Sequence, residues 1–498
     1  MKIRVRYAPS PTGLQHVGGI RTALFNYLFA QKEGGDFILR LEDTDQSRCD
    51  DKYVQNLYDT FDWLGFRWVE GPDVGGPNAP YIQSERYDIY KKYALDLLNT
   101  DRAYYCFCSS ERIESVRKQR EDAHSSESGY DRHCRSLDKD EASRRAAAGE
   151  PHTIRLKIPL EKNGEEAVTT CHDVLLGEII WKNKDVNPDP VLIKSDGFPT
   201  YHLANIVDDH LMGVTHVMRA QEWQPSIPLH VILYESFGWT PPVFCHLPMV
   251  MGQDGKKLSK RHGATSVDEF RRQGYLPEAL INYIALLGAS YEEGKDIYSL
   301  SELAERFSLE KLNTAPAVFD YKKLEWYNGQ YIRMKTDSEL ASLTLGNAVT
   351  TGLFGAAGQQ PTAEQEALYT AAMPLVKERA VFLTDVPEKL SYLFSEPSFP
   401  AKEEFFPKKA DLPTTIDLLT KAQKVLQSLA EASSDEEAET LVKAFAETEQ
   451  IKLGDLMMPL RVAITGARVS PPLFGSLRLL GAQKALSRVE KALVFLAS

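Results

Sequence analysis

The chain of 498 residues has little cysteine, no excess of positive charge and no long apolar run, and each shortage excludes a class of protein. Six cysteines in so long a chain do not suggest a disulfide framework, so we expect reduced thiols. No stretch approaches the roughly 20 continuous apolar residues that span a bilayer, and the N-terminus has the pattern of a strand rather than of a charged and then apolar leader. We therefore expect a cytoplasmic protein without a membrane partner.

The formal net charge of −12 argues, taken alone, against a nucleic-acid partner, because phosphate binding depends on clustered lysine and arginine. Basic clusters nevertheless occur at residues 117–120, 256–261, 271–272 and 408–409. They are compatible with a basic face on an acidic body. Scattered solvated charge is the alternative, and it is favoured if no motif is considered.

Length and pattern predict a multidomain α/β protein, since at roughly 100 to 200 residues per domain the chain should contain about three to five units. Strand and helix patterns alternate near the N-terminus and again after a mixed region, 81–194, which we interpret as an inserted domain. We expect the two halves to form one parallel sheet that binds ligands at the carboxyl ends of its strands. The expected elements are strand 3–8, helix 19–31, strand 37–42 and helix 50–64, then helix 202–212, strand 216–220, helix 226–237 and strand 243–247.

The C-terminal third has a purely helical pattern. Apolar residues at helical spacing predict helices over 276–287 and 300–307, and nearly everything from about Asp337 to the end follows the same period. Prolines near 397–413 predict a boundary between two helical units.

A glycine-rich segment near the N-terminus has the composition of a phosphate-binding turn. Residues 9–19 (PSPTGLQHVGG) lie between a predicted strand and a predicted helix, where free amides bind anions. His16 can donate to phosphate oxygens, and Gly18 and Gly19 let the backbone approach a nucleotide closely. Such turns are common, so this segment alone is modest support for a nucleotide site.

A basic segment in the middle of the chain complements the turn. Residues 257–261 (KLSKR), here called the lysine loop, carry Lys257 and Lys260. These cations can follow the negative charge that develops on a leaving pyrophosphate. Lysine-rich loops are usually just solvated, and it is the pairing of the two segments that predicts an ATP site.

With these segments in the places of the HIGH and KMSKS motifs, the chain resembles the class I aminoacyl-tRNA synthetases, and more closely the glutamyl-tRNA synthetases of bacterial type. Longer blocks carry the resemblance in the family's order. They are RYAPSPTG at 6–13, RLEDTD at 40–45, SDGFPTYHLAN at 195–205 and GDLMMPLR at 454–461. Two mild departures are Gly19 in place of the last histidine of the first motif, and KLSKR as the form of the second.

The resemblance implies a set of site residues. The ATP-binding residues would be Pro9, Thr12, Gly13, His16, Gly18, Gly19, Lys257, Ser259 and Lys260. Catalysis would fall to His16, Gly18, Lys257 and Lys260. The glutamate site would be lined by Arg6, Ala8, Ser10, Glu42, Tyr201, Asn205 and Arg219.

The chemistry of glutamate agrees with two of these residues. The ligand needs a guanidinium for its side-chain carboxylate and a buried acid for its α-amine. Arg6 lies on the first predicted strand just before the turn and Glu42 ends the second, so both can reach the carboxyl edge of the sheet. A glutamine ligand would leave Arg6 without a charged partner, which we expect to discriminate strongly. The alternatives are a surface arginine on a strand and a solvated acidic turn.

The implied reaction joins L-glutamate to ATP, with Mg²⁺ on the nucleotide, to give glutamyl-adenylate, and then transfers glutamate to the terminal adenosine of tRNA(Glu). Attachment to the 2'-hydroxyl, activation that waits for bound tRNA, and a monomeric state are implied by the family alone. Whether tRNA(Gln) is also charged stays open, with Arg379 as one candidate for reading the anticodon. The implied fold is α/β: a Rossmann-type catalytic domain (1–81 and 195–255) split by an α+β acceptor-stem domain (82–194), a stem-contact domain (256–336) and two all-α anticodon-binding domains (337–400 and 401–498).

A cysteine group in the inserted domain predicts a structural zinc site or three buried thiols. Cys106, Cys108 and Cys134 offer three ligands for tetrahedral Zn²⁺. The family's fourth ligand would fall at position 136, which is serine here. Tyr130 or His133 is therefore the candidate for the fourth ligand.

Three other functions compete with this interpretation. A HIGH-type nucleotidyltransferase, or a truncated relative that glutamylates a modified tRNA base, would need no long helical tail, and this chain has one. An RNA-binding or scaffolding protein that has lost catalysis would not need His16, Gly18, Lys257 and Lys260.

Overall fold

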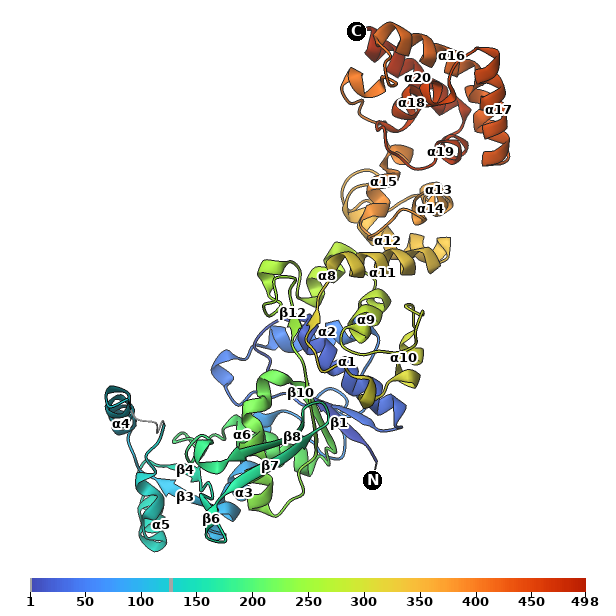
Figure 1. Cartoon of the computed structure of the whole chain (residues 1–498). Helices are drawn as coiled ribbons and strands as arrows, with labels where there is room; N and C mark the ends of the chain where they lie inside the picture. The colour runs from blue at the N-terminus through green and yellow to red at the C-terminus, as the bar shows by residue number, and fades with distance from the viewer. Residues whose placement is uncertain (1, 125–128) are drawn as a thin grey trace. The chain divides into compact units, whose positions relative to one another are not determined.

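The computed structural model describes residues 2–124 and 129–498 (Figure 1). The chain divides into two compact units, one comprising Met1–Phe270 and Leu280–Asp320, the other Arg271–Ala279 and Tyr321–Ser498. The first unit is mixed α/β and the second is helical. The six-part domain division stays a prediction.

The first unit begins with the strand, helix and strand that carry the N-terminal motif. β1 (Arg4–Tyr7) and β2 (Asp36–Leu39) are parallel, with Val5 opposite Phe37. Helix α1 (Val17–Lys32) makes the crossover that parallel strands require. α2 (Asp51–Leu64) follows after β2.

β2 ends at Leu39, three residues before the end of the predicted strand 37–42, because the chain changes its hydrogen-bond partners there. The amide of Arg40 still donates to the carbonyl of Tyr7 (3.0 Å), but the amide of Glu42 donates to the carbonyl of Pro9 (3.0 Å). Glu42 is thereby held against the loop of the first motif rather than within a strand.

A second sheet lies in the first unit, with the strand order β10-β11-β7-β8. Its parallel pair, β10 and β11, follows helices α6 and α7 in the predicted alternation. β7 joins β11 in parallel through Phe244 and Asp173, and β8 pairs antiparallel with β7. The bounds are β7 (Val168–Asp173), β8 (Gly177–Lys182), α6 (Tyr201–Leu211), β10 (His216–Ala220), α7 (Ile227–Phe237) and β11 (Val243–Leu247).

The expectation of one continuous sheet is wrong. β1 and β2 form a sheet of their own, and β1 meets the segment before β10 through Thr215. The Thr215 hydroxyl accepts from the amide of Arg4 (2.9 Å), while the amide of Thr215 donates to the carbonyl of Arg4 (2.9 Å). The hydroxyl of Thr215 thus takes the place of a backbone carbonyl as the acceptor for Arg4, and the backbone hydrogen bonding between β1 and the β10 segment is interrupted there.

The region between the halves contains a three-stranded antiparallel sheet of order β3-β4-β9. Its core is continuous with that of α6 and α7, since Leu97 and Leu156 belong to the same buried cluster as Leu203 and Leu233. The elements are α3 (Tyr87–Asn99), β3 (Ala103–Cys106), α4 (Ser110–Asp122), α5 (Lys139–Ala147), β4 (Thr153–Leu156), β5 (Glu161–Lys162), β6 (Glu165–Glu166) and β9 (Val191–Ile193).

After β11, the short strands β12 and β13 pair in parallel, and the amide of Leu258 in the lysine loop donates to the carbonyl of Val250 in β12 (2.9 Å). The remaining elements up to residue 320 are helical. The bounds of these two strands and of the helices are β12 (Val250–Met251), α8 (Val267–Gln273), α9 (Pro277–Leu286), α10 (Leu300–Arg306) and β13 (Ala317–Val318).

Residues 321–498, all within the described ranges, contain helices and no strand, which confirms the predicted helical tail. Capping boxes start α12 and α13, where Thr336 pairs with Glu339 and Thr362 with Gln365. None of the helices in the described parts of the chain has the length and apolar character needed to cross a membrane. The helices are α11 (Tyr321–Met334), α12 (Asp337–Thr350), α13 (Ala363–Ala371), α14 (Met373–Lys377), α15 (Asp385–Phe394), α16 (Leu412–Glu431), α17 (Asp435–Thr448), α18 (Leu453–Thr465), α19 (Leu473–Leu480) and α20 (Ala482–Ala497).

Candidate active site

Two backbone hydrogen bonds join the first motif to the segment that follows the lysine loop. The amide of Val17 donates to the carbonyl of Thr265 (3.0 Å), and the amide of Val267 donates to the carbonyl of Gln15 (3.0 Å). These bonds flank His16. The first motif is therefore in direct contact, at the N-terminus of α1, with the segment that follows the lysine loop.

His16 is the N-cap of α1, and its Nδ1 accepts from the amide of Gly19 (3.2 Å). The ring therefore carries its proton on Nε2 when neutral. The surrounding protein desolvates the ring and lowers the pKa of His16, nearby Lys257 lowers it further, and Glu222 opposes both. A neutral His16 thus has its Nε2–H left as a donor.

Packing leaves little room for a side chain at Gly19 and makes a close contact at Gly18. A Cβ at Gly19 would lie 2.8 Å from the hydroxyl of Tyr7, and one at Gly18 would lie 3.3 Å from the His16 ring. Gly13 has nothing within 4 Å of such a Cβ. Contacts within the protein therefore disfavour a side chain at Gly18 and at Gly19, which the sequence pattern did not reveal.

The other residues of this turn lie in the loop between β1 and α1. The carbonyl of Pro9 accepts from Glu42, and the amide of Thr12 donates to the carbonyl of Ser10 (2.8 Å). Ala8 is half-buried and Ser10 is exposed.

The lysine loop holds its two lysines in different states. Lys257 forms an ion pair with Glu222, which lies in the 3-10 turn Gln221–Ser226. Ser259 precedes a short 3-10 turn, Lys260–His262, and its amide donates to Nδ1 of His262 (3.0 Å). Within the described residues Lys260 has no hydrogen bond or ion pair and is exposed, so its ammonium is available to a ligand.

Arg6 has a charged partner within the protein, contrary to the expectation that only a ligand would supply one. Its Nε and Nη2 donate to the two carboxylate oxygens of Asp209 at 3.1 and 3.2 Å. Both side chains are buried. The argument that a glutamine ligand would leave Arg6 unpaired is therefore wrong, and the N–H groups left for a ligand are both of those on Nη1 and the second one on Nη2.

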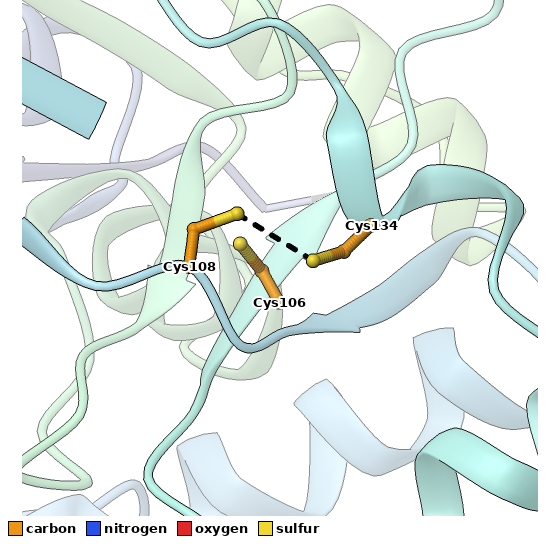
Figure 2. Close-up of side chains that lie close together, drawn as sticks. All are labelled: Cys106, Cys108 and Cys134. Carbon is orange, nitrogen blue, oxygen red and sulfur yellow. Dashed lines mark hydrogen bonds between the residues drawn. The ribbon is translucent and has the colours of Figure 1, made fainter. Parts of the chain in front are cut away.

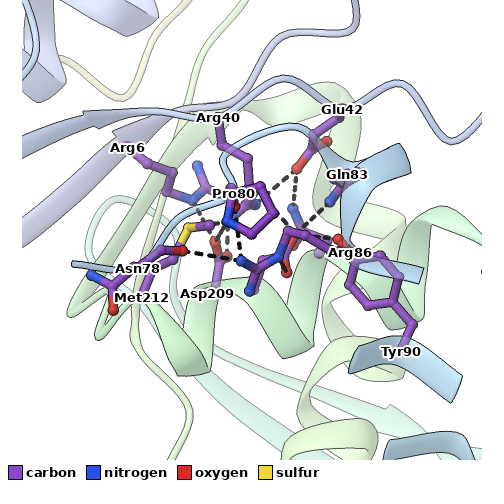
Figure 3. A network of polar contacts seen from close by, with 12 residues as sticks. Arg6, Arg40, Glu42, Asn78, Pro80, Gln83, Arg86, Tyr90, Asp209 and Met212 are labelled. Atoms are coloured by element: carbon purple, nitrogen blue, oxygen red, sulfur yellow. Dashed lines mark hydrogen bonds and ion pairs between the residues drawn. The ribbon is translucent and has the colours of Figure 1, made fainter. Parts of the chain in front are cut away.

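Arg6 and Glu42 belong to one network of alternating charges (Figure 3). Arg40 is fully buried and bridges them, donating to Asp209 (2.7 Å) and to Oε1 of Glu42 (2.8 Å). The same Oε1 accepts from Nδ2 of Asn205 (2.8 Å), while the buried Oδ1 of Asn205 has no partner in the described part of the chain. Oε2 of Glu42 is thus left for a cationic ligand group.

Sequence reasoning missed Arg40, Asp208 and Asp209. Asp208 is fully buried and accepts from Gln83 (2.9 Å) and Arg86 (2.7 Å), so it ties α6 to the segment after β2. The available signal was the acidic pair inside an otherwise apolar helix, since buried carboxylates require partners.

Arg219, at the end of β10, is 5% exposed and donates to Tyr201 (3.2 Å). Burial lowers the pKa of this guanidinium, and burial raises the pKa of Tyr201 to about 12. Arg219, Glu42, Arg6 and Asp209 all act electrostatically on the hydroxyl of Tyr201. Trp223 packs on the ring of Tyr201, with centroids 4.5 Å apart.

Residues 2–326 match the family described as "tRNA synthetases class I (E and Q), catalytic domain", and residues 344–493 match "Anticodon binding domain". The chain belongs to the class I tRNA synthetases of this E and Q family. It is 55% identical to the glutamate–tRNA ligase of Treponema denticola over 509 residues, covering 99% of both chains. It is 47% identical to that of Borreliella burgdorferi over 496 residues, covering 100% of this chain and 99% of the relative.

Solved structures agree with the sequence relatives. A glutamate tRNA ligase from Elizabethkingia meningosepticum, in complex with its amino acid, matches with a TM-score of 0.87 and 35% identity over 100% of both chains. That of Elizabethkingia anophelis gives 0.84 and 35%, covering 99% of this chain and 100% of the other. The chain is thus an ATP-dependent ligase that attaches L-glutamate to tRNA, as the resemblance implied.

A second cluster lies in the inserted region of this synthetase. The sulfurs of Cys106, Cys108 and Cys134 lie within 4.8 Å of one another, and those of Cys108 and Cys134 are 3.6 Å apart (Figure 2). The hydroxyl of Tyr130 lies 3.3 Å from the Cys106 sulfur and 3.8 Å from that of Cys108. His133 is exposed, so Tyr130 is the better fourth member.

Proposed function

We propose that L-glutamate binds around Tyr201, with its side-chain carboxylate at Arg219 and Arg6 Nη1 and its α-amine at Glu42. The observation that carries this assignment is that Arg219 is a buried guanidinium without an acidic partner among the described residues, and it donates to the hydroxyl of Tyr201. A buried cation without a counter-ion is unfavourable, so an anionic ligand stabilises it. Asn205, with its unpartnered Oδ1, and Ala8 and Ser10 complete the pocket.

ATP would lie where the first motif meets the lysine loop. The Nε2–H of His16, the free amides at the start of α1 and the mobile Lys260 supply donors for the triphosphate, and Lys257 would exchange Glu222 for phosphate. Pro9, Thr12, Gly13, Gly18, Gly19 and Ser259 would shape the site. Mg²⁺ bound to the nucleotide would neutralise phosphate charge.

The reaction then needs positioning and charge stabilisation rather than a covalent enzyme intermediate. The α-carboxylate of glutamate attacks the α-phosphorus of ATP in line, glutamyl-adenylate forms, and pyrophosphate leaves toward Lys257 and Lys260. The terminal adenosine of tRNA then accepts the glutamyl group and AMP is released.

The assignment is tested at Arg219. Arg219→Gln removes the charge, and we expect the KM for glutamate in tRNA aminoacylation to rise about 100-fold or more, because a charge-assisted bidentate contact is lost. The KM for ATP should change little. Unchanged glutamate KM in a folded variant would contradict the assignment.

We also propose that Cys106, Cys108, Cys134 and Tyr130 bind one structural Zn²⁺. Four ligands suit tetrahedral zinc, and Zn–S bonds of about 2.3 Å imply sulfur separations near those of this cluster. Hydrogen bonding to Cys134, against the opposing effect of burial, lowers the pKa of Cys106. Arg112 lies 3.4 Å from the Cys108 sulfur and the Arg155 guanidinium 3.9 Å from the Tyr130 ring, so cations offset the thiolate charge.

Metal analysis of the purified protein tests this site. We expect about one zinc per chain, its loss in Cys134→Ser, and its retention in the control Cys171→Ser, since Cys171 is buried elsewhere. Tyr130→Phe should weaken binding and His133→Ala should not. A wild-type protein without stoichiometric zinc would rule the site out.

The partners beyond tRNA and glutamate are also proposals. We infer a cytoplasmic monomer with an acceptor-stem-binding insertion at 82–194, a stem-contact domain at 256–336 and anticodon-binding domains at 337–400 and 401–498. tRNA(Glu) is the proposed substrate, and charging assays with purified tRNA(Glu) and tRNA(Gln) would test whether the second is also used. Arg379, which donates to the carbonyl of Ser470 (3.1 Å), is the position to vary in that assay.

A further inference from the structure

The guanidinium of Arg219 is held by neutral groups alone. Arg6 and Arg40, the other buried arginines around the proposed pocket, each bind a carboxylate. In the parts of the chain that the structure describes, Arg219 makes no ion pair. Its hydrogen-bond partners are Nε2 of His246 (2.9 Å), the hydroxyl of Tyr201 (3.2 Å), Nδ1 of His230 (3.4 Å) and the carbonyl of Trp223 (3.4 Å).

The contacts of Arg219 fix the proton positions of two buried histidines. Arginine only donates, so Nε2 of His246 and Nδ1 of His230 must both accept. The proton of His246 is then on Nδ1, which lies 2.7 Å from Asp173. The proton of His230 is on Nε2, which lies 3.0 Å from Nδ1 of His202. One placement of the ring protons gives each hydrogen bond from Asp173 through His246, Arg219 and His230 to His202 a donor and an acceptor. In that placement the rings of His246 and His230 are both neutral.

Asp173 anchors the arrangement without neutralising Arg219. It is fully buried at the end of β7, where the pairing with Phe244 brings it beside β11. Its carboxylate accepts from the amides of Leu175 (2.9 Å) and Leu176 (3.1 Å) as well as from the amide of His246 (3.1 Å). The imidazole of His246 separates Asp173 from the guanidinium of Arg219. Three backbone amides hold the carboxylate of Asp173 in place, and its fourth hydrogen bond orients the ring of His246, while Arg219 keeps its charge.

We propose that His246, His230 and Asp173 are positioning residues that hold Arg219 through neutral acceptors, so that the side-chain carboxylate of glutamate becomes its counter-ion. A carboxylate in the place of either histidine would satisfy the arginine internally and weaken the demand for an anionic substrate. This inference rests on the proposed role of Arg219 in glutamate binding.

Asparagine and glutamine substitutions separate the two functions of each ring. The amide of asparagine reaches the position of a histidine Nδ1, and that of glutamine reaches the position of Nε2. At His246, glutamine keeps an acceptor for Arg219 and asparagine keeps a donor for Asp173. At His230 the relation is reversed, since there Nδ1 faces the arginine.

The inference therefore predicts opposite orders at the two positions. We expect the KM for glutamate to rise about 10- to 100-fold in His246→Asn and in His230→Gln, where a buried guanidinium donor is left unpaired. His246→Gln and His230→Asn should stay within about threefold of wild type. The KM for ATP should not change in any of the four.

A purely structural role would give a different result. If the rings only fill space, asparagine should be worse than glutamine at both positions; if only the contact with Asp173 matters, His246→Asn should be the milder change. Either order overturns the inference. The exposed His210 supplies the matched control pair, His210→Asn and His210→Gln, and circular dichroism with thermal midpoints identifies any variant that does not fold.

Asp173→Asn is a further test of this inference, and Arg219→Gln separates the inference from the proposed function. Asp173→Asn should raise the glutamate KM, because an amide NH₂ facing Nδ1 favours the tautomer that points Nε2–H at Arg219. If Arg219→Gln leaves the glutamate KM unchanged, the proposed function fails. If Arg219→Gln raises it and the histidine variants do not follow the predicted orders, the positioning role alone fails.

Discussion

The carboxylate of Asp209 binds Arg6 through both of its oxygens and also accepts from Arg40, so one buried acid serves two buried arginines. Arg6 is therefore oriented before any ligand arrives. Such preorganisation fixes where Nη1 points and lowers the entropic cost of binding glutamate.

Asp209→Asn should unfold the first unit more easily, because it leaves the buried Arg6 without a counter-ion and removes one of the carboxylates that the buried Arg40 binds. We expect a loss of about 3–5 kcal/mol in the free energy of unfolding, measured by urea denaturation. Asp96→Asn is the control, since among the described residues the side chain of Asp96 makes only an exposed i,i+4 pair with Lys92, at 3.9 Å, and its loss should cost less than about 0.5 kcal/mol. Equal effects of the two substitutions would show that the network around Asp209 is not a source of stability.

Lys260→Ala should lower glutamyl-adenylate formation by about 10²- to 10³-fold, because a mobile cation for the pyrophosphate is removed. Pyrophosphate exchange in the presence of tRNA measures the step, and tRNA binding should stay nearly intact. Lys256→Ala, a neighbouring exposed lysine outside the proposed site, is the control. Exchange at an undiminished rate in Lys260→Ala would refute the role.

Gly19→Ala should destabilise the protein although alanine favours helices. Its Cβ would lie 2.8 Å from the buried Tyr7 hydroxyl, which donates to Gln15 (2.8 Å). We expect this overpacking to cost about 1–3 kcal/mol, more than the roughly 1 kcal/mol gained in helix propensity. Gly13→Ala should leave the thermal midpoint unchanged, since nothing lies within 4 Å of its Cβ. An equal midpoint for both variants would contradict the steric argument.

Acid should destabilise the first unit partly through His202. Burial, reinforced by Arg219, lowers the pKa of His202 from 6.5 to about 4. Between these values the unfolded chain binds a proton that the folded chain does not, so stability present above about pH 6.5 is lost as the pH falls toward 4. His202→Asn keeps an acceptor for His230 but cannot titrate.

The thermal midpoint measured from pH 7 to pH 4.5 tests this linkage. The wild-type midpoint should fall further than that of His202→Asn, by an amount equivalent to about 1–3 kcal/mol. Parallel curves for the two proteins would exclude His202 as the titrating group.

The sequence by itself determined the types and order of the elements in the two α/β stretches, the helical character of the tail and the two motif segments, because helical and strand periodicity are local properties of the chain. The predicted strands 216–220 and 243–247 coincide with β10 and β11, and the predicted helices lie within one or two residues of the observed ones. The KLSKR and PSPTGLQHVGG segments also indicated the family that the comparisons confirm.

Only the tertiary structure decided which charges neutralise one another. Asp209 lies 203 positions from Arg6, and Asp173 lies 73 positions from His246. No periodicity links residues so far apart, since each pair forms only when separate strands and helices pack. The same packing left Arg219 with neutral neighbours and gave Arg6 an acid, a distinction between two arginines that the residue types alone do not contain.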